Sequence, residues 1–283
     1  MSVASPLPAR DPPPGLGWRR VLRVRGDGQQ AVEDAVADEV PVAFAYNGEP
    51  FVVMMATPCD LEDFAIGFSL SEGIVGAGDR VEVLAVEPSL EGIALSLRIP
   101  ADRAAALHAR RRNLQGRSGC GICGAESVEA VLRTPPRLPD GAVFANAAVH
   151  AAVRALRDRQ PLNAETGAVH AAGFADAGGR LLAVREDVGR HNALDKLVGA
   201  LARADIDPGA GFAVVTSRAS YEMAMKAAQA GIPLLAAISA PTTLAIALAH
   251  SAGLALVGFA RDGGHGVYAH AQRLSGPLQE DTR

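Results

Sequence analysis

One segment of the sequence places two cysteines where sulfur chemistry is possible. Residues 117–124 read RSGCGICG, so Cys120 and Cys123 form a Cys-x-x-Cys pair between glycines. The thiolate is the reactive form of cysteine, and both Arg117 and the start of a following helix would favour it. The flanking glycines would let this loop present both sulfurs to a large partner. We therefore take Cys120 and Cys123 as candidate catalytic residues.

Two other interpretations of this cysteine pair are open. It could be half of a structural zinc site, but Cys59 is the one cysteine left over, so histidines would have to complete the ligand set. It could also be a thioredoxin-like dithiol, although that motif normally follows an early strand of a βαβ unit, whereas hairpins are expected before this one. Three cysteines are too few for a disulfide framework and indicate a reducing compartment.

A second polar block, REDVGRHNALDK over residues 185–196, is predicted at a junction between a strand and a helix. Open α/β sheets bind ligands at the carboxyl ends of their strands, so Arg190 and His191 are candidate binding residues. The alternative is an ordinary helix start in which His191 or Asn192 is the N-cap and a buried apolar stripe follows. Both interpretations can hold together.

Three further segments are predicted to leave strands together at one edge of a sheet. Residues 216–220 contain Ser217 and Arg218, residues 239–243 read SAPTT, and residues 259–266 read FARDGGHG. Hydroxyls, an arginine and free N–H groups at helix starts suit phosphates, although each segment alone could be ordinary capping. Together they predict a nucleotide cleft. Neither a P-loop nor a G-x-G-x-x-G precedes a helix, so the sequence does not support a nucleotide triphosphatase or a Rossmann dehydrogenase. The zinc-deaminase signature is also absent, and no metal ligands are assigned.

The part of the chain before the cysteine loop is predicted to be α+β. Two β runs over residues 41–55 flank an Asn-Gly dipeptide, which is typical of a hairpin turn. An amphipathic helix is predicted from Leu61, with Asp60 or Thr57 as its N-cap. A second hairpin is predicted over residues 81–87 and 93–99, and a helix over 101–111.

Beyond a proline-rich break at residues 135–139, strands and helices alternate. Strands are predicted over residues 169–174, 181–185, 212–216, 234–238 and 254–259, and helices over 149–156, 191–202, 219–230 and 242–251. This alternation predicts a mainly parallel sheet with helices on both faces. The apolar stretch 234–259 is interrupted by polar residues and proline, so no membrane span is predicted.

Composition sets the limits of this interpretation. The chain has 283 residues, a net charge of −4, 49% hydrophobic residues and 20% charged residues. This mix is typical of a globular protein with a substantial core, and the acidic balance excludes a basic nucleic-acid binder. The division that we expect is a flexible tail over residues 1–20, a smaller α+β subdomain over 21–140 that carries the hairpins, and an α/β subdomain over 141–283.

The sequence resembles the FdhD family of formate dehydrogenase accessory sulfurtransferases. Six blocks carry the resemblance, in family order: ATPCDLEDFAIGFSLSEGI (56–74), GCGICGAES (119–127), TGAVHAA (166–172), REDVGRHNALDK (185–196), TSRASYEM (216–223) and GFARDGG (258–264). The chain departs from the family pattern at Ala168, where glycine is expected, and in the more glycine-rich segment 263–266.

The resemblance implies a cytoplasmic homodimer with a cytidine-deaminase-like, three-layer α/β core that has lost its metal site. Such a protein takes sulfur from a cysteine desulfurase as a cysteine persulfide. It delivers this sulfur to the molybdenum cofactor, bis-molybdopterin guanine dinucleotide, before formate dehydrogenase can work. No nucleic acid or membrane partner is expected.

Carried onto this sequence, the persulfide cysteine matches Cys120, and Cys123 would assist or resolve it. The cofactor-binding stretch matches Phe259, Ala260, Arg261, Asp262, Gly263 and Gly264, and we add His191, Ser217 and Arg218 from the neighbouring segments. Cys59 lies outside the motif. The rival functions are a chaperone that binds and inserts the cofactor without sulfur transfer, and a zinc-stabilised interaction module.

Overall fold

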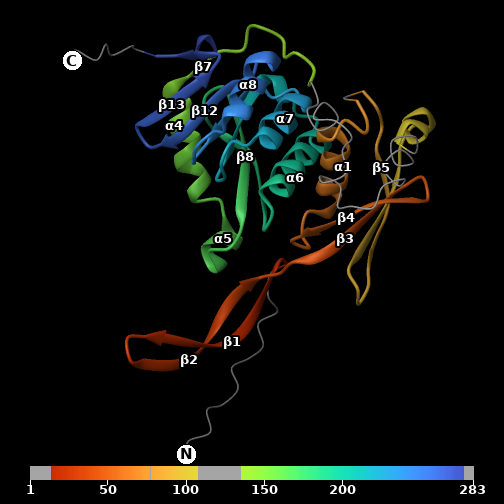
Figure 1. Ribbon diagram of the computed structural model, residues 1–283, viewed down its shortest axis with the longest axis vertical. Helices are drawn as coiled ribbons and strands as arrows, with labels where there is room; N and C mark the ends of the chain where they lie inside the picture. The colour runs from red at the N-terminus through yellow and green to blue at the C-terminus, as the bar shows by residue number, and fades with distance from the viewer. Residues whose placement is uncertain (1–13, 77, 108–134, 277–283) are drawn as a thin grey trace, which may run out of the picture.

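The computed structural model describes residues 14–76, 78–107 and 135–276 (Figure 1). These residues form two main β-sheets with their helices, a long two-stranded hairpin and a short two-stranded pair of β7 and β14. The first part of the chain forms β1 (Leu16–Arg25), β2 (Gly28–Ala37), β3 (Val40–Tyr46), β4 (Glu49–Ala56), α1 (Leu61–Ser71), β5 (Glu82–Pro88) and β6 (Ile93–Arg98). Helical residues 101–107 follow, within the predicted 101–111.

The second part of the chain contains the larger sheet and its helices. It forms β7 (Phe144–Ala145), α4 (Asn146–Arg157), α5 (Pro161–Thr166), β8 (His170–Asp176), β9 (Leu181–Asp187), α6 (Arg190–Arg203), η1 (Pro208–Ala210), β10 (Gly211–Val215), α7 (Tyr221–Gln229), β11 (Leu234–Ala237), α8 (Thr243–Ala252), β12 (Ala255–Arg261), β13 (Gly264–Ala269), η2 (Ala271–Arg273) and β14 (Leu274–Ser275).

The smaller sheet has the strand order β4-β3-β6-β5, and both predicted hairpins are confirmed in it. Asn47 and Gly48 have φ values of 50° and 87°, as the two central residues of a type I′ turn require. Helix α1 covers this sheet, and the rings of Phe44 and Phe64 meet with centroids 5.1 Å apart. Because those rings are deeply buried, they anchor α1 on the sheet.

The side-chain capping predicted for α1 is wrong. Asp60 occupies the N-cap position with φ 51°, but its side chain makes no capping hydrogen bond. The hydroxyl of Thr57 instead accepts from the backbone N–H of Val188 at 3.1 Å. Thr57 is therefore used to join the smaller sheet to the larger one.

The larger sheet has the order β13-β12-β11-β10-β8-β9 and is mixed, so the prediction of a mainly parallel sheet is wrong. The β10–β11 and β11–β12 pairs are parallel, whereas β8 and β9, β8 and β10, and β12 and β13 are antiparallel. Tight turns through Gly179 and Gly263, both at positive φ, join β8 to β9 and β12 to β13. Turns as short as these can connect only antiparallel strands.

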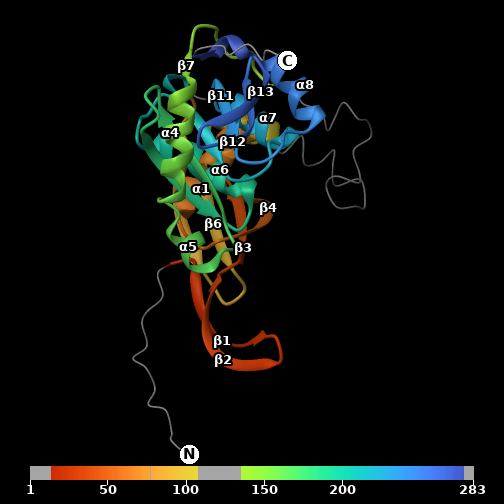
Figure 2. The same cartoon turned by 90° about the vertical axis from the view of Figure 1, so that its left-hand side faces the viewer.

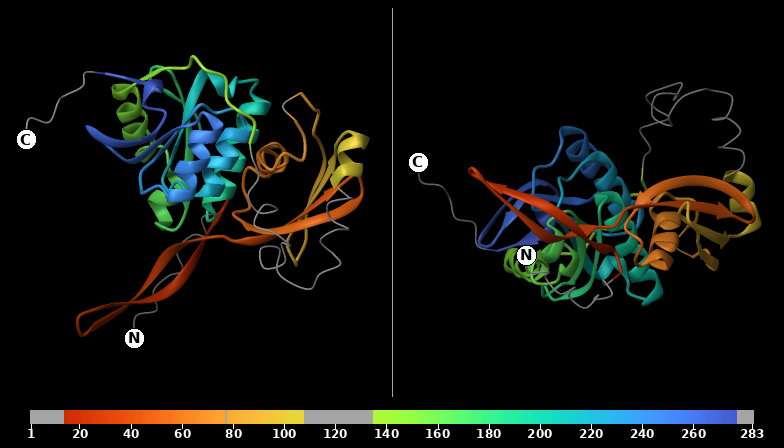
Figure 3. Two further views of the ribbon diagram at one scale, coloured as in Figure 1. Left: turned by 45° about the horizontal axis from the view of Figure 1, so that its top comes forward. Right: turned by 90° about the horizontal axis from the view of Figure 1, so that it is seen from below.

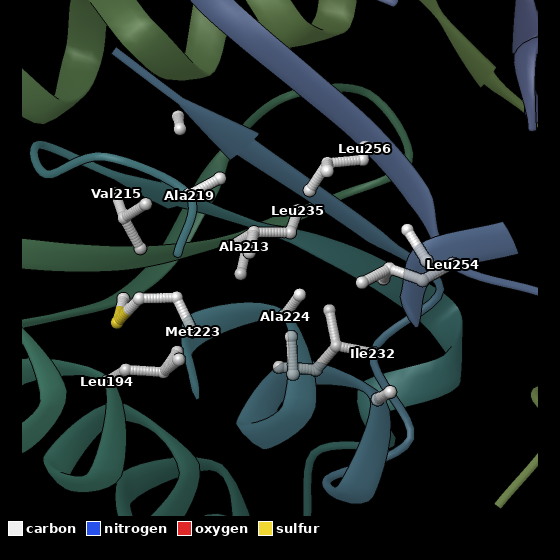
Figure 4. Close-up of a cluster of buried hydrophobic side chains, with 14 of the residues drawn as sticks. Leu194, Ala213, Val215, Ala219, Met223, Ala224, Ile232, Leu235, Leu254 and Leu256 are labelled. Carbon is white, nitrogen blue, oxygen red and sulfur yellow. The ribbon is translucent and has the colours of Figure 1, made fainter. Parts of the chain in front are cut away.

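Helices cover both faces of the larger sheet, as predicted, which gives a three-layer α/β architecture (Figure 2). Helix α4 packs on one face, and α6, α7 and α8 pack on the other. The core under α6–α8 combines small and large side chains, among them Ala213, Leu235, Met223 and Ile232 (Figure 4). The cytidine-deaminase-like detail of this architecture stays a prediction.

The hairpin β1–β2 extends away from both sheets (Figures 1 and 3). At its base, Leu16 and Ala35 pack with Leu162 and Val169. Strand β1 includes residues that we predicted as flexible tail, because the chain from Leu16 onward pairs along its length with β2. Residues 1–13 of that predicted tail lie outside the described residues. Among those described, no helix has the length and apolar character needed to cross a membrane.

Helices α1 and α6 pack against each other with two glycines at the contact. A Cβ atom on Gly67 would lie 1.7 Å from the Asp195 carbonyl oxygen, and one on Gly199 would lie 1.9 Å from the Asp63 carbonyl oxygen. Any larger residue would push the helices apart. This contact therefore fixes how the smaller sheet sits beside the larger one.

Candidate functional site

The carboxyl ends of β10, β11 and β12 lie side by side and bring the three predicted segments together. The backbone N–H of Ala219 donates to the Ala240 carbonyl at 3.2 Å, and that of Thr242 donates to the Ala219 carbonyl at 3.0 Å. The N–H of Phe259 donates to the Ser239 carbonyl at 3.1 Å. Residues 216–220, 239–243 and 259–264 therefore form one continuous edge, as expected where parallel strands end.

A β-bulge shapes the segment 259–264. Gly258 pairs with Gly266 and Arg261 with Gly264, so Phe259 and Ala260 stand opposite the single residue His265. Phe259 has φ 52°, and half of its side chain is exposed. A large residue at positive φ is strained, and such strain gathers at ligand sites. The bulge therefore presents an aromatic ring at the edge of the sheet.

The side chain of Arg261 is held at the same edge. Its guanidinium donates to the carbonyl of Ile238, at the end of β11, and to the Ala260 carbonyl. Asp262 and Gly263 form the exposed turn that follows. The predicted residues Phe259 to Gly264 thus form one unit, in which a ring and an arginine stand beside a glycine turn.

Arg190 and His191 stand at the start of α6, next to the start of α7. The Nε2 atom of His191 lies 2.7 Å from Oε2 of Glu222. Burial lowers the pKa of His191, and the neighbouring Glu222 carboxylate opposes this effect. No ion pair between described residues includes Arg190, and its buried Nε has no hydrogen-bond partner among them. A buried donor that makes no hydrogen bond is costly unless a ligand accepts from it.

His170 also lies at this edge, and no role was predicted for it from the sequence. Strand β8 runs antiparallel to β10, so its first residue lies where β10 ends, and His170 Nδ1 is 3.4 Å from Thr216 Oγ1. Burial and then the Arg190 charge lower the pKa of His170. The block TGAVHAA contains this histidine, but the antiparallel direction of β8 could not be read from it.

The other predicted residues differ in whether their side chains are free to bind a ligand. The Ser217 hydroxyl is buried and donates to the Arg218 carbonyl at 3.0 Å, whereas the Arg218 side chain is exposed. Ser220 is the N-cap of α7, but its buried hydroxyl makes no hydrogen bond within the described residues. Within the described part of the chain, donors without a hydrogen bond thus remain at the Ser220 hydroxyl and the Arg190 Nε, and the Arg218 side chain is exposed beside them. The edge can accept an oxyanion such as a phosphate.

Several polar residues of the block 185–196 form buried contacts that connect parts of the fold. Lys196 Nζ lies 2.7 Å from Asp187 Oδ2, and both side chains are fully buried. Asp187 also accepts from the N–H of Thr57 at 3.0 Å, and Glu186 accepts from two N–H groups at the start of α5. These carboxylates hold the smaller sheet and α5 in place, so they do not take part in binding at the strand ends.

A cleft of about 740 Å³ lies elsewhere, at the base of the β1–β2 hairpin. Its lining includes Leu16, Leu162, Glu186 and the thiol of Cys59. Burial raises the pKa of Cys59 to about 11, although Lys196 nearby lowers it in part. Cys59 is therefore protonated at neutral pH and unsuited to nucleophilic sulfur chemistry.

Cys120 and Cys123 lie outside the described residues, as does the helix predicted after them. Among the residues that the structure describes, no three histidine, cysteine, aspartate or glutamate side chains are grouped to hold a metal ion. Within the described residues, the candidate site is therefore the strand-end edge with its unpaired donors.

The fold and this edge define a three-layer α/β protein whose polar groups gather where the central parallel strands end. The model of the FdhD/NarQ family matches residues 37–275, and the chain belongs to this family.

Relatives support this assignment over nearly the whole chain. The chain is 66% identical over 261 residues to the "Sulfur carrier protein FdhD" of Xanthomonas axonopodis pv. citri, which covers 92% of this chain and 93% of that protein. It is 52% identical over 256 residues to the protein of the same name from Bordetella petrii, covering 90% and 92%. A crystal structure from Desulfotalea psychrophila, assigned as a formate dehydrogenase accessory protein, superposes with a TM-score of 0.70 at 25% identity and covers 93% of this chain and 100% of that one.

Proposed function

We propose that this chain is a sulfurtransferase that moves sulfur from a cysteine desulfurase to the molybdenum cofactor of formate dehydrogenase. The observation that carries the proposal is its 66% identity, over almost its full length, to a protein named as a sulfur carrier. The glycine-flanked Cys120 and Cys123 supply the chemistry that such a carrier needs. Cytoplasmic location and a homodimer belong to the same proposal.

The transfer can be written with Cys120 as the carrier. Its thiolate attacks the outer sulfur of the desulfurase persulfide, and the desulfurase cysteine leaves as a thiolate. Attack of the Cys123 thiolate on the inner sulfur of the Cys120 persulfide then releases the outer sulfur as hydrosulfide. This hydrosulfide would replace an oxygen ligand of the cofactor, and the oxygen would leave as water. A disulfide between Cys120 and Cys123 remains, and a cellular dithiol must reduce it before the next cycle.

The cofactor, here the substrate, would bind through its guanine dinucleotide ends at the strand-end edge. Phe259 offers a half-exposed ring for a base, and Arg261, Asp262 and the glycine turn stand next to it. His191, Ser217 and Arg218 belong to the adjoining segments. Among the described residues there, Arg190 Nε and the Ser220 hydroxyl make no hydrogen bond and could donate to phosphates. Local donors suffice for this role despite the net negative charge of the chain.

The first test is persulfide formation. After incubation with a cysteine desulfurase and cysteine, mass spectrometry should locate one added sulfur atom on Cys120 in the Cys123→Ala variant, which lacks the resolving thiol, and in the Cys59→Ala/Cys123→Ala double variant. Cys59 is the matched control because its half-buried thiol has a raised pKa and is a poor nucleophile at neutral pH. Absence of the adduct from an accessible Cys120 would contradict the proposal.

The second test separates sulfur transfer from a chaperone function. A cell that lacks its own copy of this protein is given the wild type, Cys120→Ala or Cys59→Ala, and formate dehydrogenase activity is measured. We expect activity with the wild type and Cys59→Ala, and none with Cys120→Ala. Full activity with Cys120→Ala would favour the chaperone.

A further inference from the structure

Helix α4 contacts the β12–β13 turn through two side chains that stand one helical turn apart. His150 Nε2 lies 2.9 Å from His265 Nδ1, and their rings meet edge to face with centroids 5.0 Å apart. Arg154 forms an ion pair with Asp262. Both partners belong to the turn that carries the proposed cofactor-binding residues, so α4 holds that turn from the face opposite to α6, α7 and α8.

The two contacts lie beside the β-bulge that contains the strained Phe259. His265 is the residue opposite the bulge, and Asp262 follows Arg261 directly. Phe259 at φ 52° stays in a strained conformation only if its surroundings hold it there. A Cβ atom added to Gly263 or Gly264 would have no heavy atom within 4 Å, so packing at those two positions contributes little.

We propose that His150 and Arg154 are positioning residues for the segment 259–264: they hold the bulge in the conformation that presents Phe259 and Arg261, and they release it when both imidazoles are protonated. The inference rests on the proposed function of that segment. It adds residues on a separate element, α4, and a dependence on pH.

The pH dependence follows from the hydrogen bond between the two imidazoles. One ring must accept while the other donates, so at least one must be neutral. Among the described residues, His150 on α4 is the titratable group that acts on His265, and the ion pair of Arg154 with Asp262 is the other contact of α4 with this turn. Burial, and then His150, lower the pKa of His265 below its ordinary 6.5. One proton can be shared between the two rings, so the contact is present at neutral pH and is lost only as the pH falls through the lowered pKa of His265.

The test measures binding of guanosine diphosphate by calorimetry and hydrogen exchange of residues 262–266. At about pH 8, the His150→Ala/Arg154→Ala double variant should bind the nucleotide about tenfold more weakly than the wild type and exchange these amides faster. This is the size of effect expected from one hydrogen bond and one exposed ion pair. Equal affinity and equal exchange would overturn the inference.

Two single variants test the role of protonation. His150→Gln keeps a hydrogen-bonding group that does not titrate, so its affinity should fall less than that of the wild type between about pH 8 and pH 5.5. His250→Gln is the matched control, because His250 and His270 form a ring pair with centroids 5.7 Å apart away from this turn. It should follow the wild type. Identical pH profiles for all three proteins would contradict the release step.

Failure of the two proposals can be told apart. A wild-type protein that does not bind guanosine diphosphate contradicts the cofactor role of residues 259–264. Binding that is equally tight in the wild type and the double variant contradicts only the positioning role of α4.

Discussion

Side chains at the strand-end edge differ mainly in whether their hydrogen-bond donors have an acceptor within the protein. The guanidinium of Arg261 donates to two backbone carbonyls, and Ser217 donates to a third. Arg190, with a buried Nε, has no such acceptor within the described residues. A protein tolerates an unpaired buried donor when a ligand satisfies it. Arg190 is therefore the side chain at this edge whose surroundings most clearly call for an anion.

We predict that Arg190→Gln binds guanosine diphosphate at least about tenfold more weakly than the wild type, which is the usual effect of losing a charge-assisted hydrogen bond. Calorimetry at one ionic strength measures the change, and circular dichroism checks the fold. Arg180→Gln is the control, because Arg180 is paired with Asp176 in an exposed turn. Equal affinities in Arg190→Gln and Arg180→Gln would remove Arg190 from the site.

Among the elements, the contact between α1 and α6 decides where the smaller sheet lies. Asp63 on α1 forms ion pairs with Arg185 and Arg203, and Gly67 and Gly199 allow the two backbones to approach. The blocks ATPCDLEDF and REDVGRHNALDK therefore meet in space and support each other. Asp63 in the first block and Arg185 in the second therefore have a structural role at this contact.

We expect Gly67→Ala to lower the free energy of unfolding by about 3 kcal/mol, at the upper end of the cost of overpacking. The added methyl group would meet backbone atoms of α6 that cannot move aside alone. Urea unfolding followed by circular dichroism measures the change. Gly28→Ala, where the nearest atom is 3.5 Å from the added carbon, is the control and should change stability by less than about 1 kcal/mol. Equal stability of the two variants would show that the helices separate without cost.

For the whole molecule, buried ion pairs join parts that are far apart in the sequence. Asp187 and Lys196 contact each other with no exposed surface, and both also bond to backbone atoms of Thr57. Lys226 similarly pairs with Asp195 and Glu72. Both members of the Asp187–Lys196 and Asp195–Lys226 pairs belong to the larger-sheet part of the chain. Thr57 and Glu72 belong to the smaller-sheet part, and the contacts to them link the two parts. We infer that the two sheets unfold together.

We predict that Lys196→Met lowers the unfolding free energy by about 3–5 kcal/mol, because the Asp187 carboxylate would stay buried without its counter-ion. Urea unfolding should still show one transition, at a lower midpoint. Arg98→Gln, which removes an exposed pair with Glu82, is the control and should cost less than about 1 kcal/mol. A Lys196→Met variant as stable as Arg98→Gln would contradict the structural role of this pair.

The order and type of most elements could be predicted from the sequence, because they depend on local patterns. The Asn47-Gly48 hairpin, helix α1 and the alternating strands and helices from β8 to β12 follow from hydrophobic periodicity and turn residues. The three polar segments at strand ends were also visible, since each directly follows an apolar strand. The roles of the cysteines rest on residues that the structure does not describe and stay predictions.

The tertiary structure decided what depends on contacts between distant residues. Strand direction was one such property, and the antiparallel course of β8 places His170 beside Thr216, 46 positions later. The purpose of the block 185–196 was another, because Asp187 reaches the N–H of Thr57 across 130 positions. The contacts of α4 with the β12–β13 turn are a third such property. Local sequence sets the propensity of a segment, whereas its partner depends on how the whole chain packs.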